Sequence, residues 1–169
     1  MMKKTRYNIA VVGAMGLVGG EIIKTLERRN FPIGEFHPLD MAKNAGKEVG
    51  FQGKPYKIQT ACKDNFKGID IALFSAGGNA SKILAPDAVE MGAIVVDNSS
   101  AWRMDEKCPL VVPEVNPEDL DWHNGIIANP NCSTIQLVVV LKPLHDEGTI
   151  KRVVVSTYQA AAGAGKMGI

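Results

Sequence analysis

The sequence predicts an α/β fold with a Rossmann-type, doubly wound and mostly parallel sheet. Two observations lead to this prediction. Short runs rich in β-branched residues alternate along the chain with helical patterns, which is typical of parallel strands covered by helices on both faces. A glycine-rich turn also separates the first predicted strand from the first predicted helix, as at the opening of a βαβ unit.

In the first half of the chain, the clearest elements are a strand over residues 7–12 and a helix over residues 17–29. The helix is predicted because Val18, Ile22 and Leu26 recur at helical spacing while charged residues occupy the opposite face. After this helix we expect strands over residues 35–41 and 57–61, with a loop and turn over residues 44–53.

In the second half, a strand over residues 69–75 is stopped by two glycines. Asn79 can cap the helix that follows to about residue 91, although Pro86 interrupts its pattern. The remaining expected elements are a strand over residues 93–97, a polar loop over 98–107, short apolar runs at 110–112 and 126–128, a helix over 132–145 and a last strand over 153–158.

Composition limits the function classes. The chain has 169 residues, with 19 Lys and Arg against 18 Asp and Glu and a formal net charge of +1. This balance argues against nucleic acid as a main partner, which needs a clustered basic surface. No apolar run approaches the roughly 20 residues of a membrane span, and the basic start of the chain leads directly into a strand rather than a signal peptide. We therefore expect a cytosolic protein without membrane contact.

The cysteines and histidines do not indicate a metal site. Cys62, Cys108 and Cys132 are odd in number and widely spaced, which fits free thiols better than disulfides or a CxxC motif. The three histidines show no spacing with cysteines or carboxylates that would assemble a zinc site. No metal is expected.

The glycine turn is a candidate dinucleotide-binding site. Gly13, Gly16 and Gly19 lie between a predicted strand and a predicted helix. There the backbone can approach a pyrophosphate, and the helix N-terminus offers unpaired N–H groups. The spacing departs from the common GxGxxG pattern. The alternative is a tight turn required only for packing.

The residues at the end of the second predicted strand, and just after it, leave the choice of cofactor open. Asp40 lies where an acidic side chain binds the ribose 2′-hydroxyl of NAD. Lys43 follows three residues later and can pair with the 2′-phosphate of NADP. Either charge can equally belong to an exposed loop.

Cys132 is the candidate nucleophile. It lies in or beside the first turn of a predicted helix, which Asn131 or Ser133 can cap. The helix dipole and free N–H groups at this position stabilise a thiolate and can hold the oxyanion of a tetrahedral intermediate. The alternative is a buried structural cysteine, which is the expectation for Cys62 and Cys108.

Two further polar residues follow predicted strands. Arg103 comes after the strand at residues 93–97, at the strand end where open α/β sheets bind ligands, and its guanidinium suits a phosphate or carboxylate. Gln159 ends the last predicted strand and can hydrogen-bond a substrate. A solvated loop arginine and a structural glutamine are the alternatives.

Taken together, these residues resemble aspartate-semialdehyde dehydrogenase, in order along the whole 169-residue chain. The most specific matching segment is Asn129 to Gln136. Lys43 and Asn44 stand where the family usually has Arg and Ser. The other matching segments are residues 11–19, 45–47, 97–104, 111–116, 156–160 and 163–165.

The resemblance implies the reaction. Members of this family use NADPH to reduce aspartyl β-phosphate to aspartate semialdehyde, with release of phosphate, on the route to lysine, methionine and threonine. By this resemblance Cys132 attacks the acyl carbon and expels phosphate, and hydride from the nicotinamide reduces the thioester. Arg103 and Asn131 hold the phosphate, and Gln159 orients the substrate.

The resemblance also implies a set of residues against the cofactor NADP. They are Gly13, Ala14, Met15, Gly16, Leu17, Val18, Lys43, Asn44, Ser75, Ala76, Gly77, Ala162 and Gly163.

Members of this family continue into a second domain that supplies the catalytic histidine and the dimer interface. The resemblance therefore implies a dinucleotide-binding domain over residues 1–131 and the start of a truncated α+β catalytic domain over residues 132–169. His123 and His145 do not match the catalytic histidine. We expect this chain alone to be inactive and the full-length protein to be a homodimer.

Two other hypotheses remain open. N-acetyl-γ-glutamyl-phosphate reductase performs the same chemistry on a related scaffold, but its cysteine segment usually differs from the one at residues 129–134. A non-catalytic dinucleotide-binding module, such as a redox sensor, would need no reactive Cys132. The thiol signature of glyceraldehyde-phosphate dehydrogenase is absent.

Overall fold

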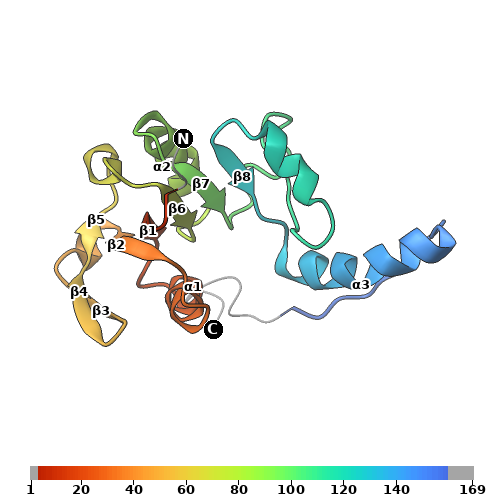
Figure 1. Ribbon diagram of the computed structural model, residues 1–169, viewed down its shortest axis with the longest axis horizontal. Helices are drawn as coiled ribbons and strands as arrows, with labels where there is room; N and C mark the ends of the chain where they lie inside the picture. Colours follow the sequence, from red (N-terminus) through yellow and green to blue (C-terminus); the bar gives the residue numbers. More distant parts are fainter. Residues whose placement is uncertain (1–3, 160–169) are drawn as a thin grey trace.

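The computed structural model describes residues 4–159, and its centre is a six-stranded sheet (Figure 1). All pairs in this sheet are parallel, in the order β5-β2-β1-β6-β7-β8, which confirms the predicted mostly parallel, Rossmann-type sheet. The strands are β1 (Tyr7–Val12), β2 (Ile33–Asp40), β5 (Gln59–Thr60), β6 (Ile71–Phe74), β7 (Ile94–Asp97) and β8 (Ile126–Ala128).

The sheet is covered on both faces, as the unbroken apolar runs of its central strands require. Because side chains alternate along a strand, Ile9 and Val11 of β1 pack with helix α1 (Leu17–Arg28) in one core cluster. Ala10 and Val12 belong to a second cluster, with helix α2 (Gly78–Glu90). The predicted strand at residues 7–12 and helix at residues 17–29 are therefore confirmed, the helix to within one residue.

A β-hairpin replaces the loop expected over residues 44–53, so that prediction is wrong. Strands β3 (Glu48–Phe51) and β4 (Lys54–Lys57) pair antiparallel around a two-residue turn in which Gln52 and Gly53 both have positive φ. Phe51 is buried and stacks on Phe36, with ring centroids 4.4 Å apart. Burial of the Phe51 ring, which the local sequence pattern does not reveal, explains why a segment rich in polar residues and glycine forms strands here.

Helix α2 begins differently from the prediction. Its N-cap is Gly77, with φ 83° and ψ 160°, so Asn79 lies inside the first turn and does not cap the helix. Glycine is suited to this backbone conformation because it carries no Cβ. Pro86 lies within the helix on its exposed side, while Ser81 and Ala85 face the core.

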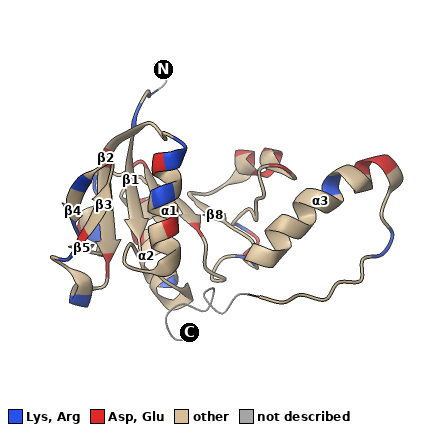
Figure 2. Cartoon of the chain, turned by 90° about the horizontal axis from the view of Figure 1, so that it is seen from below, with Lys and Arg blue, Asp and Glu red and all other residues tan. Residues whose placement is uncertain are grey.

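The connections carry little regular structure. The expected loop at residues 98–107 is present, and the apolar run at 110–112 contributes an isolated bridge between Leu110 and Ala128. Three short 3₁₀ helices complete the connections: η1 (Ala42–Asn44), η2 (Lys63–Phe66) and η3 (Pro117–Trp122). Acidic and basic residues are interspersed over the described chain (Figure 2).

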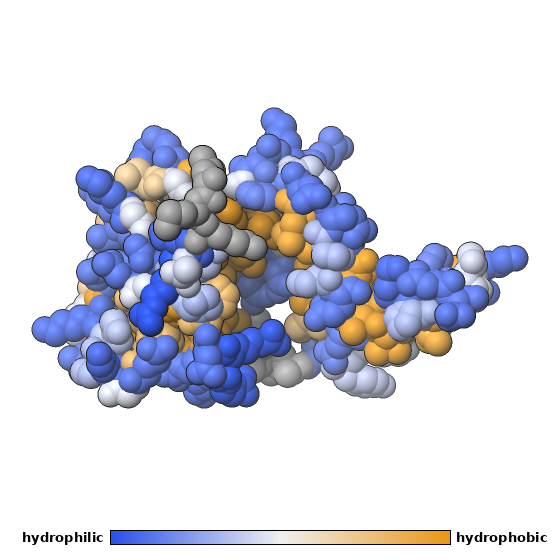
Figure 3. All heavy atoms as spheres, in the orientation of Figure 1, coloured by the Kyte–Doolittle hydropathy of each residue, from blue (hydrophilic) through white to orange (hydrophobic). Residues whose placement is uncertain are grey.

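Helix α3 (Cys132–Gly148) extends away from the sheet, and none of its residues is buried (Figures 1 and 2). Apolar side chains such as Val140 and Leu144 lie on its surface, where Figure 3 shows an apolar area. None of the helices formed by residues 4–159 is both long and apolar enough to span a membrane.

The strand expected over residues 153–158 is not formed, so that prediction is wrong. Residues 149–159 carry no regular secondary structure and run back beside α3, where Ile150 and Val153 line a shallow groove with Val138 and Leu141 (Figure 1). The valine-rich run has high β-propensity, but a strand requires a neighbour with which to exchange backbone hydrogen bonds. No strand in the described part of the chain lies alongside it.

Candidate active site

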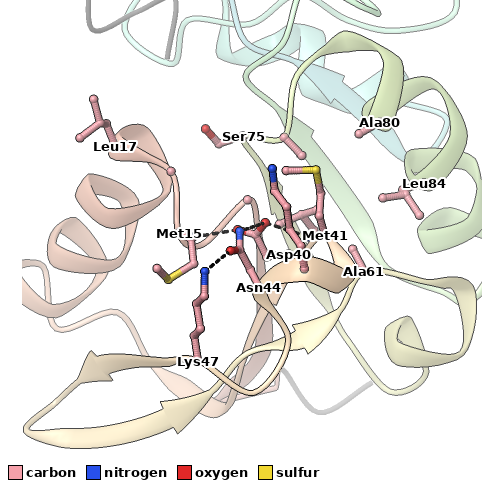
Figure 4. A pocket seen from close by; sticks show the side chains of 15 residues that line it. Met15, Leu17, Asp40, Met41, Asn44, Lys47, Ala61, Ser75, Ala80 and Leu84 are labelled. Carbon is pink, nitrogen blue, oxygen red and sulfur yellow. Dashed lines mark hydrogen bonds between the residues drawn. The ribbon is translucent and has the colours of Figure 1, made fainter. Parts of the chain in front are cut away.

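A cleft of about 670 Å³ opens beyond the carboxyl ends of β1, β2 and β6 (Figure 4). Ligands of open parallel sheets bind at this edge, where the chain connections diverge. The cleft is lined by the ends of β1 and β2, by the connections after β1, β2, β5 and β6, and by α1 and α2: Val12, Gly13, Met15, Gly16, Leu17, Asp40, Met41, Lys43, Asn44, Lys47, Ala61, Ser75, Ala76, Ala80 and Leu84.

Two glycines of the first connection are required by close backbone approaches. Gly13 has φ +87°, and a Cβ there would lie 2.5 Å from the carbonyl oxygen of Ser75. A Cβ on Gly19 would lie 2.1 Å from the carbonyl oxygen of Gly13. These contacts hold α1 against the end of β1, so Gly13 and Gly19 are required for the packing of this turn.

The same turn leaves backbone donors free at the start of α1. The first hydrogen bond within the helix runs from the Gly20 N–H to the Gly16 carbonyl oxygen, and the N-cap Gly16 has no side chain that could cap the helix. The amides of residues 17–19 therefore precede the hydrogen-bonded part of the helix. Together with the helix dipole they suit the oxygens of a pyrophosphate, so the cleft has a fitting place for a dinucleotide.

Asp40, one of the two candidates for ribose recognition, is engaged by the protein itself. It is 5% exposed. Its Oδ2 accepts a hydrogen bond from the Met15 amide at 2.9 Å, and its Oδ1 accepts from the Met41 amide at 2.7 Å and from Asn44 Nδ2 at 3.0 Å. Three of the roughly four acceptor positions of the carboxylate are thus occupied. Asp40 joins the glycine turn to the connection after β2.

Two lysines between β2 and β3 line the cleft. Lys43 and Lys47 both line it, and Lys47 Nζ donates a hydrogen bond to Asn44 Oδ1 at 2.7 Å. Sequence reasoning selected Lys43 and Asn44 but missed Lys47. The matching segment at residues 45–47, which ends in this lysine, was the signal that pointed to it.

Most residues selected for the cofactor come together in the cleft. Those that line it are Gly13, Met15, Gly16, Leu17, Lys43, Asn44, Ser75 and Ala76. Ala14 is 2% exposed beneath the turn, and neither Val18 nor Gly77 lines the cleft. Ala162 and Gly163 lie outside the described residues.

Arg103 spans the carboxyl ends of β7 and β8. Its Nε donates to the carbonyl oxygen of Asn129 at 2.9 Å, and its Nη2 donates to the carbonyl oxygen of Asn98 at 3.2 Å. The side chains of Asn98 and Asn129 are themselves joined at 2.6 Å. The guanidinium is therefore fixed at the sheet edge by two of its five N–H donors, and the others remain for an anionic ligand.

The loop that carries Arg103 is anchored at two points. Asp97, fully buried at the end of β7, accepts hydrogen bonds from the amide and hydroxyl of Ser99. Trp102 Nε1 donates to the hydroxyl of the buried Ser81 on α2 at 2.9 Å. Both contacts restrict the backbone on either side of the arginine.

Cys132 is the first residue of α3, and its side chain is exposed. Asn131 is the N-cap: its Oδ1 accepts from the Ser133 amide at 3.0 Å and from the Ser133 hydroxyl at 2.6 Å. The sequence had left the cap open between these two residues. By contrast, burial raises the pKa of the Cys108 thiol, and the Asp105 and Asp97 carboxylates raise it further.

Gln159 is not brought to this edge by any hydrogen bond of the described residues. It is exposed, at the end of the segment that carries no regular structure. The proposed pairing of Gln159 with a substrate at Cys132 remains a prediction.

The parallel sheet places the three parts of the site on one edge. β6, β7 and β8 are adjacent and parallel, so the cleft, Arg103 and Cys132 all follow carboxyl strand ends. With strands about 4.8 Å apart, β6 and β8 are separated by about 10 Å. The cleft and the thiol therefore lie at the same edge of the sheet.

Comparison with known proteins identifies the family. Residues 8–123, which include the glycine turn and Arg103, match the family described as semialdehyde dehydrogenase, NAD binding domain. The chain belongs to the semialdehyde dehydrogenase family.

Individual semialdehyde dehydrogenases are similar over nearly all of the chain. The aspartate-semialdehyde dehydrogenase of Aquifex aeolicus is 58% identical over 96% of this chain and 49% of its own length. The structure of aspartate semialdehyde dehydrogenase II of Vibrio cholerae, complexed with ASA, superposes with a TM-score of 0.93 and 45% identity, covering 98% of this chain and 50% of that one.

A more distant semialdehyde dehydrogenase has been solved with a cofactor. The Candida albicans aspartate semialdehyde dehydrogenase with NADP gives a TM-score of 0.73 at 26% identity, over 86% of this chain and 48% of that one. The chain thus spans about half the length of the relatives that it matches.

Proposed function

We propose that this chain is the cofactor-binding and nucleophile-bearing part of an NADP-dependent aspartate-semialdehyde dehydrogenase. The reaction is the reductive dephosphorylation of L-aspartyl 4-phosphate to L-aspartate 4-semialdehyde and phosphate, in the synthesis of lysine, methionine and threonine. The observation that carries the proposal is the common sheet edge of the cleft, Arg103 and Cys132, in a chain of this family.

Cys132 is the proposed nucleophile. Its exposed position at the first turn of α3 lets the sulfur approach an acyl carbon, and the first-turn amides that the Asn131 cap leaves free can stabilise the developing oxyanion. Attack forms a carbon–sulfur bond and breaks the carbon–oxygen bond to phosphate, which leaves as the anion. The product of this step is a thioester on Cys132.

Arg103 and Asn131 are the proposed phosphate ligands. Arg103 is fixed by Asn98 and Asn129 with N–H donors to spare, which suits a phosphate that must be held while the bond to it breaks. Asn131 uses its Oδ1 to cap α3, which leaves its Nδ2 donors for the phosphate. Gln159 is proposed to orient the amino-acid part of the substrate.

The cleft is proposed to hold NADP. When bound, NADPH supplies the hydride that reduces a thioester to an aldehyde. Residues 13–17 and the amides at the start of α1 fit its pyrophosphate, and Ser75 and Ala76 line the cleft at the end of β6. Lys43 and Lys47, between β2 and β3, are proposed to face the adenosine part of the cofactor. The Candida albicans relative, solved with NADP, supports this assignment.

We further propose that residues 1–131 form the dinucleotide-binding domain and that residues 132–169 begin the catalytic domain. The full-length enzyme is proposed to be a cytoplasmic homodimer. The chain spans about half the length of its relatives, and turnover is proposed for the full-length enzyme.

The proposal is tested by acylation of the chain itself. The protein is incubated with L-aspartyl 4-phosphate, and the intact mass is measured after acid quenching. We expect one added aspartyl group in the wild-type chain and in Cys62→Ala, a matched control, and none in Cys132→Ala. Absence of the adduct from wild type, or its persistence in Cys132→Ala, contradicts the proposed role of Cys132. Faster acylation of Cys132 by N-acetylglutamyl phosphate than by L-aspartyl 4-phosphate supports the related reductase instead.

A further inference from the structure

A series of hydrogen bonds joins the glycine turn to an ammonium group at the edge of the cleft (Figure 4). Asp40 accepts from the Met15 amide through Oδ2 and from Asn44 Nδ2 through Oδ1. Asn44 in turn accepts from Lys47 Nζ. Three segments that are separate in sequence, the glycine turn, the end of β2 and the residues before the β3–β4 hairpin, are thereby held in one arrangement.

The orientation of Asn44 follows from Asp40. A carboxylate only accepts hydrogen bonds, so it must face the Nδ2 group of the amide, which turns Oδ1 toward Lys47. Lys47 uses one of its three N–H donors on this oxygen, and two remain for a ligand in the cleft that it lines. An exposed lysine side chain is ordinarily mobile, whereas this one is fixed at its charged end.

The charge at this end of the cleft suits a phosphate group. Lys43 lies on the short helix η1 between Asp40 and Lys47, and it lines the same cleft. The two ammonium groups match the charge of about −1.5 to −2 on a phosphomonoester. Asp40 also lines the cleft, but it is 5% exposed and its carboxylate accepts three N–H hydrogen bonds from the protein, which stabilise its negative charge.

We propose that Asp40, Asn44 and Lys47 together select a dinucleotide that carries a 2′-phosphate. Lys47 binds the phosphate with Lys43, and Asp40 and Asn44 are positioning residues that hold Lys47 in place. This inference rests on the proposed function, in that it takes the cleft to bind a dinucleotide. It reverses the usual role of an acidic residue at the end of β2, which excludes the 2′-phosphate.

The two roles of Asp40 predict opposite results for Asp40→Asn. If Asp40 excludes the phosphate, removing its charge tightens NADPH binding. If Asp40 positions Lys47, the Nδ2 group of the new asparagine faces at least one of the N–H groups that now donate to the carboxylate, and that hydrogen bond is lost. Lys47 is then held less firmly, and NADPH binding weakens. NADH binding distinguishes a local effect from general unfolding.

The experiment is a titration of the chain with NADPH and with NADH, followed by nicotinamide fluorescence at low ionic strength. We expect Lys47→Met to weaken NADPH binding about tenfold, the usual effect of losing one charge-assisted hydrogen bond, and to change NADH binding less than about twofold. Lys54→Met, an exposed lysine on β4, is the matched control and leaves both affinities unchanged. Asp40→Asn and Asn44→Leu weaken NADPH binding selectively.

Each contrary outcome has a distinct meaning. Equal weakening of NADPH and NADH by Lys47→Met, no effect of Lys47→Met, or tighter NADPH binding by Asp40→Asn overturns this inference while leaving the cofactor cleft in place. A wild-type chain that binds neither cofactor refutes the cofactor assignment itself, and this inference with it. Lys47 is exposed, so Lys47→Met tests the inference independently of whether the Asp40→Asn variant folds.

Discussion

The Nε of Arg103 donates a hydrogen bond to the carbonyl oxygen of Asn129, 2.9 Å away. This bond ties the connection after β7 to the last residues before Cys132. Together with the bond from Nη2 to the Asn98 carbonyl oxygen, it fixes the guanidinium at the carboxyl edge of the sheet. The arginine thus has a structural role at the sheet edge that is separate from its proposed role as a phosphate ligand.

Arg103→Lys keeps the charge but removes the planar fork. We expect acylation of Cys132 by aspartyl phosphate to slow about 30- to 100-fold, equivalent to about 2–3 kcal/mol, because a lysine cannot hold Asn129, Asn98 and a phosphate together. Rapid-quench mass measurement gives the rate. Asn98→Ser is a useful comparison, since it loses the side-chain bond to Asn129 but keeps the guanidinium. Equal rates for Arg103→Lys and wild type would remove Arg103 from the site.

Gly19→Ala tests the close approach of α1 to the end of β1. The added Cβ would lie 2.1 Å from the Gly13 carbonyl oxygen, so helix and turn must separate. We expect a loss of about 2–3 kcal/mol in the free energy of unfolding, measured in urea, and loss of NADPH binding. Gly20→Ala is the matched control: its Cβ meets nothing within 4 Å, and we expect a gain of up to about 1 kcal/mol. Similar effects of both substitutions would contradict the packing described here.

The sequence allowed the central sheet and the glycine turn to be predicted because their signals are local. Residues 9–12 are uniformly apolar, as a strand buried on both faces must be, and the glycine turn follows directly. Cys132 at a helix start was likewise predictable from Asn131 and the apolar residues that follow. These features depend on neighbours within one or two turns of the chain.

The features that were missed depend on contacts between distant residues. The β3–β4 hairpin is stabilised by Phe51 against Phe36 of β2, and the role of Asp40 depends on the Met15 amide, 25 residues earlier. The strand predicted over residues 153–158 was wrong for the opposite reason. Its valines favour a strand, but no strand of the described chain pairs with this segment. Local propensity does not indicate whether a partner is present.

The pH dependence of stability is expected to involve Asp70 at the start of β6. Partial burial opposes its ionisation, but hydrogen bonds from Lys4 Nζ at 2.6 Å and from the Asn8 amide at 2.7 Å outweigh this and lower the pKa of Asp70. A carboxylate with a lowered pKa in the folded state stabilises the protein above its unfolded pKa of about 3.9. That stabilisation is lost as the pH falls through the folded-state pKa.

Asp70→Asn should therefore reduce the free energy of unfolding at pH 7, and the difference from wild type should vanish toward pH 2. Urea unfolding at several pH values measures both curves. Glu118→Gln, an exposed acid on η3, serves as the control and should follow wild type. A difference that stays constant from pH 7 to pH 2 would show that the carboxylate contributes through its shape and not through its charge.

The three cysteines provide a test that needs no substrate. Cys132 is exposed at the first turn of α3, Cys62 is half-buried, and Cys108 is buried, with a pKa raised by burial. Because the thiolate is the reactive form and must be reached by the reagent, we expect iodoacetamide at pH 7 to alkylate Cys132 first and Cys108 last. Peptide mass spectrometry over time gives the three rates, and unfolding in urea should bring them close together. Faster alkylation of Cys62 than of Cys132 would show that the start of α3 does not activate its thiol, and the nucleophile would have to be sought elsewhere on the sheet edge.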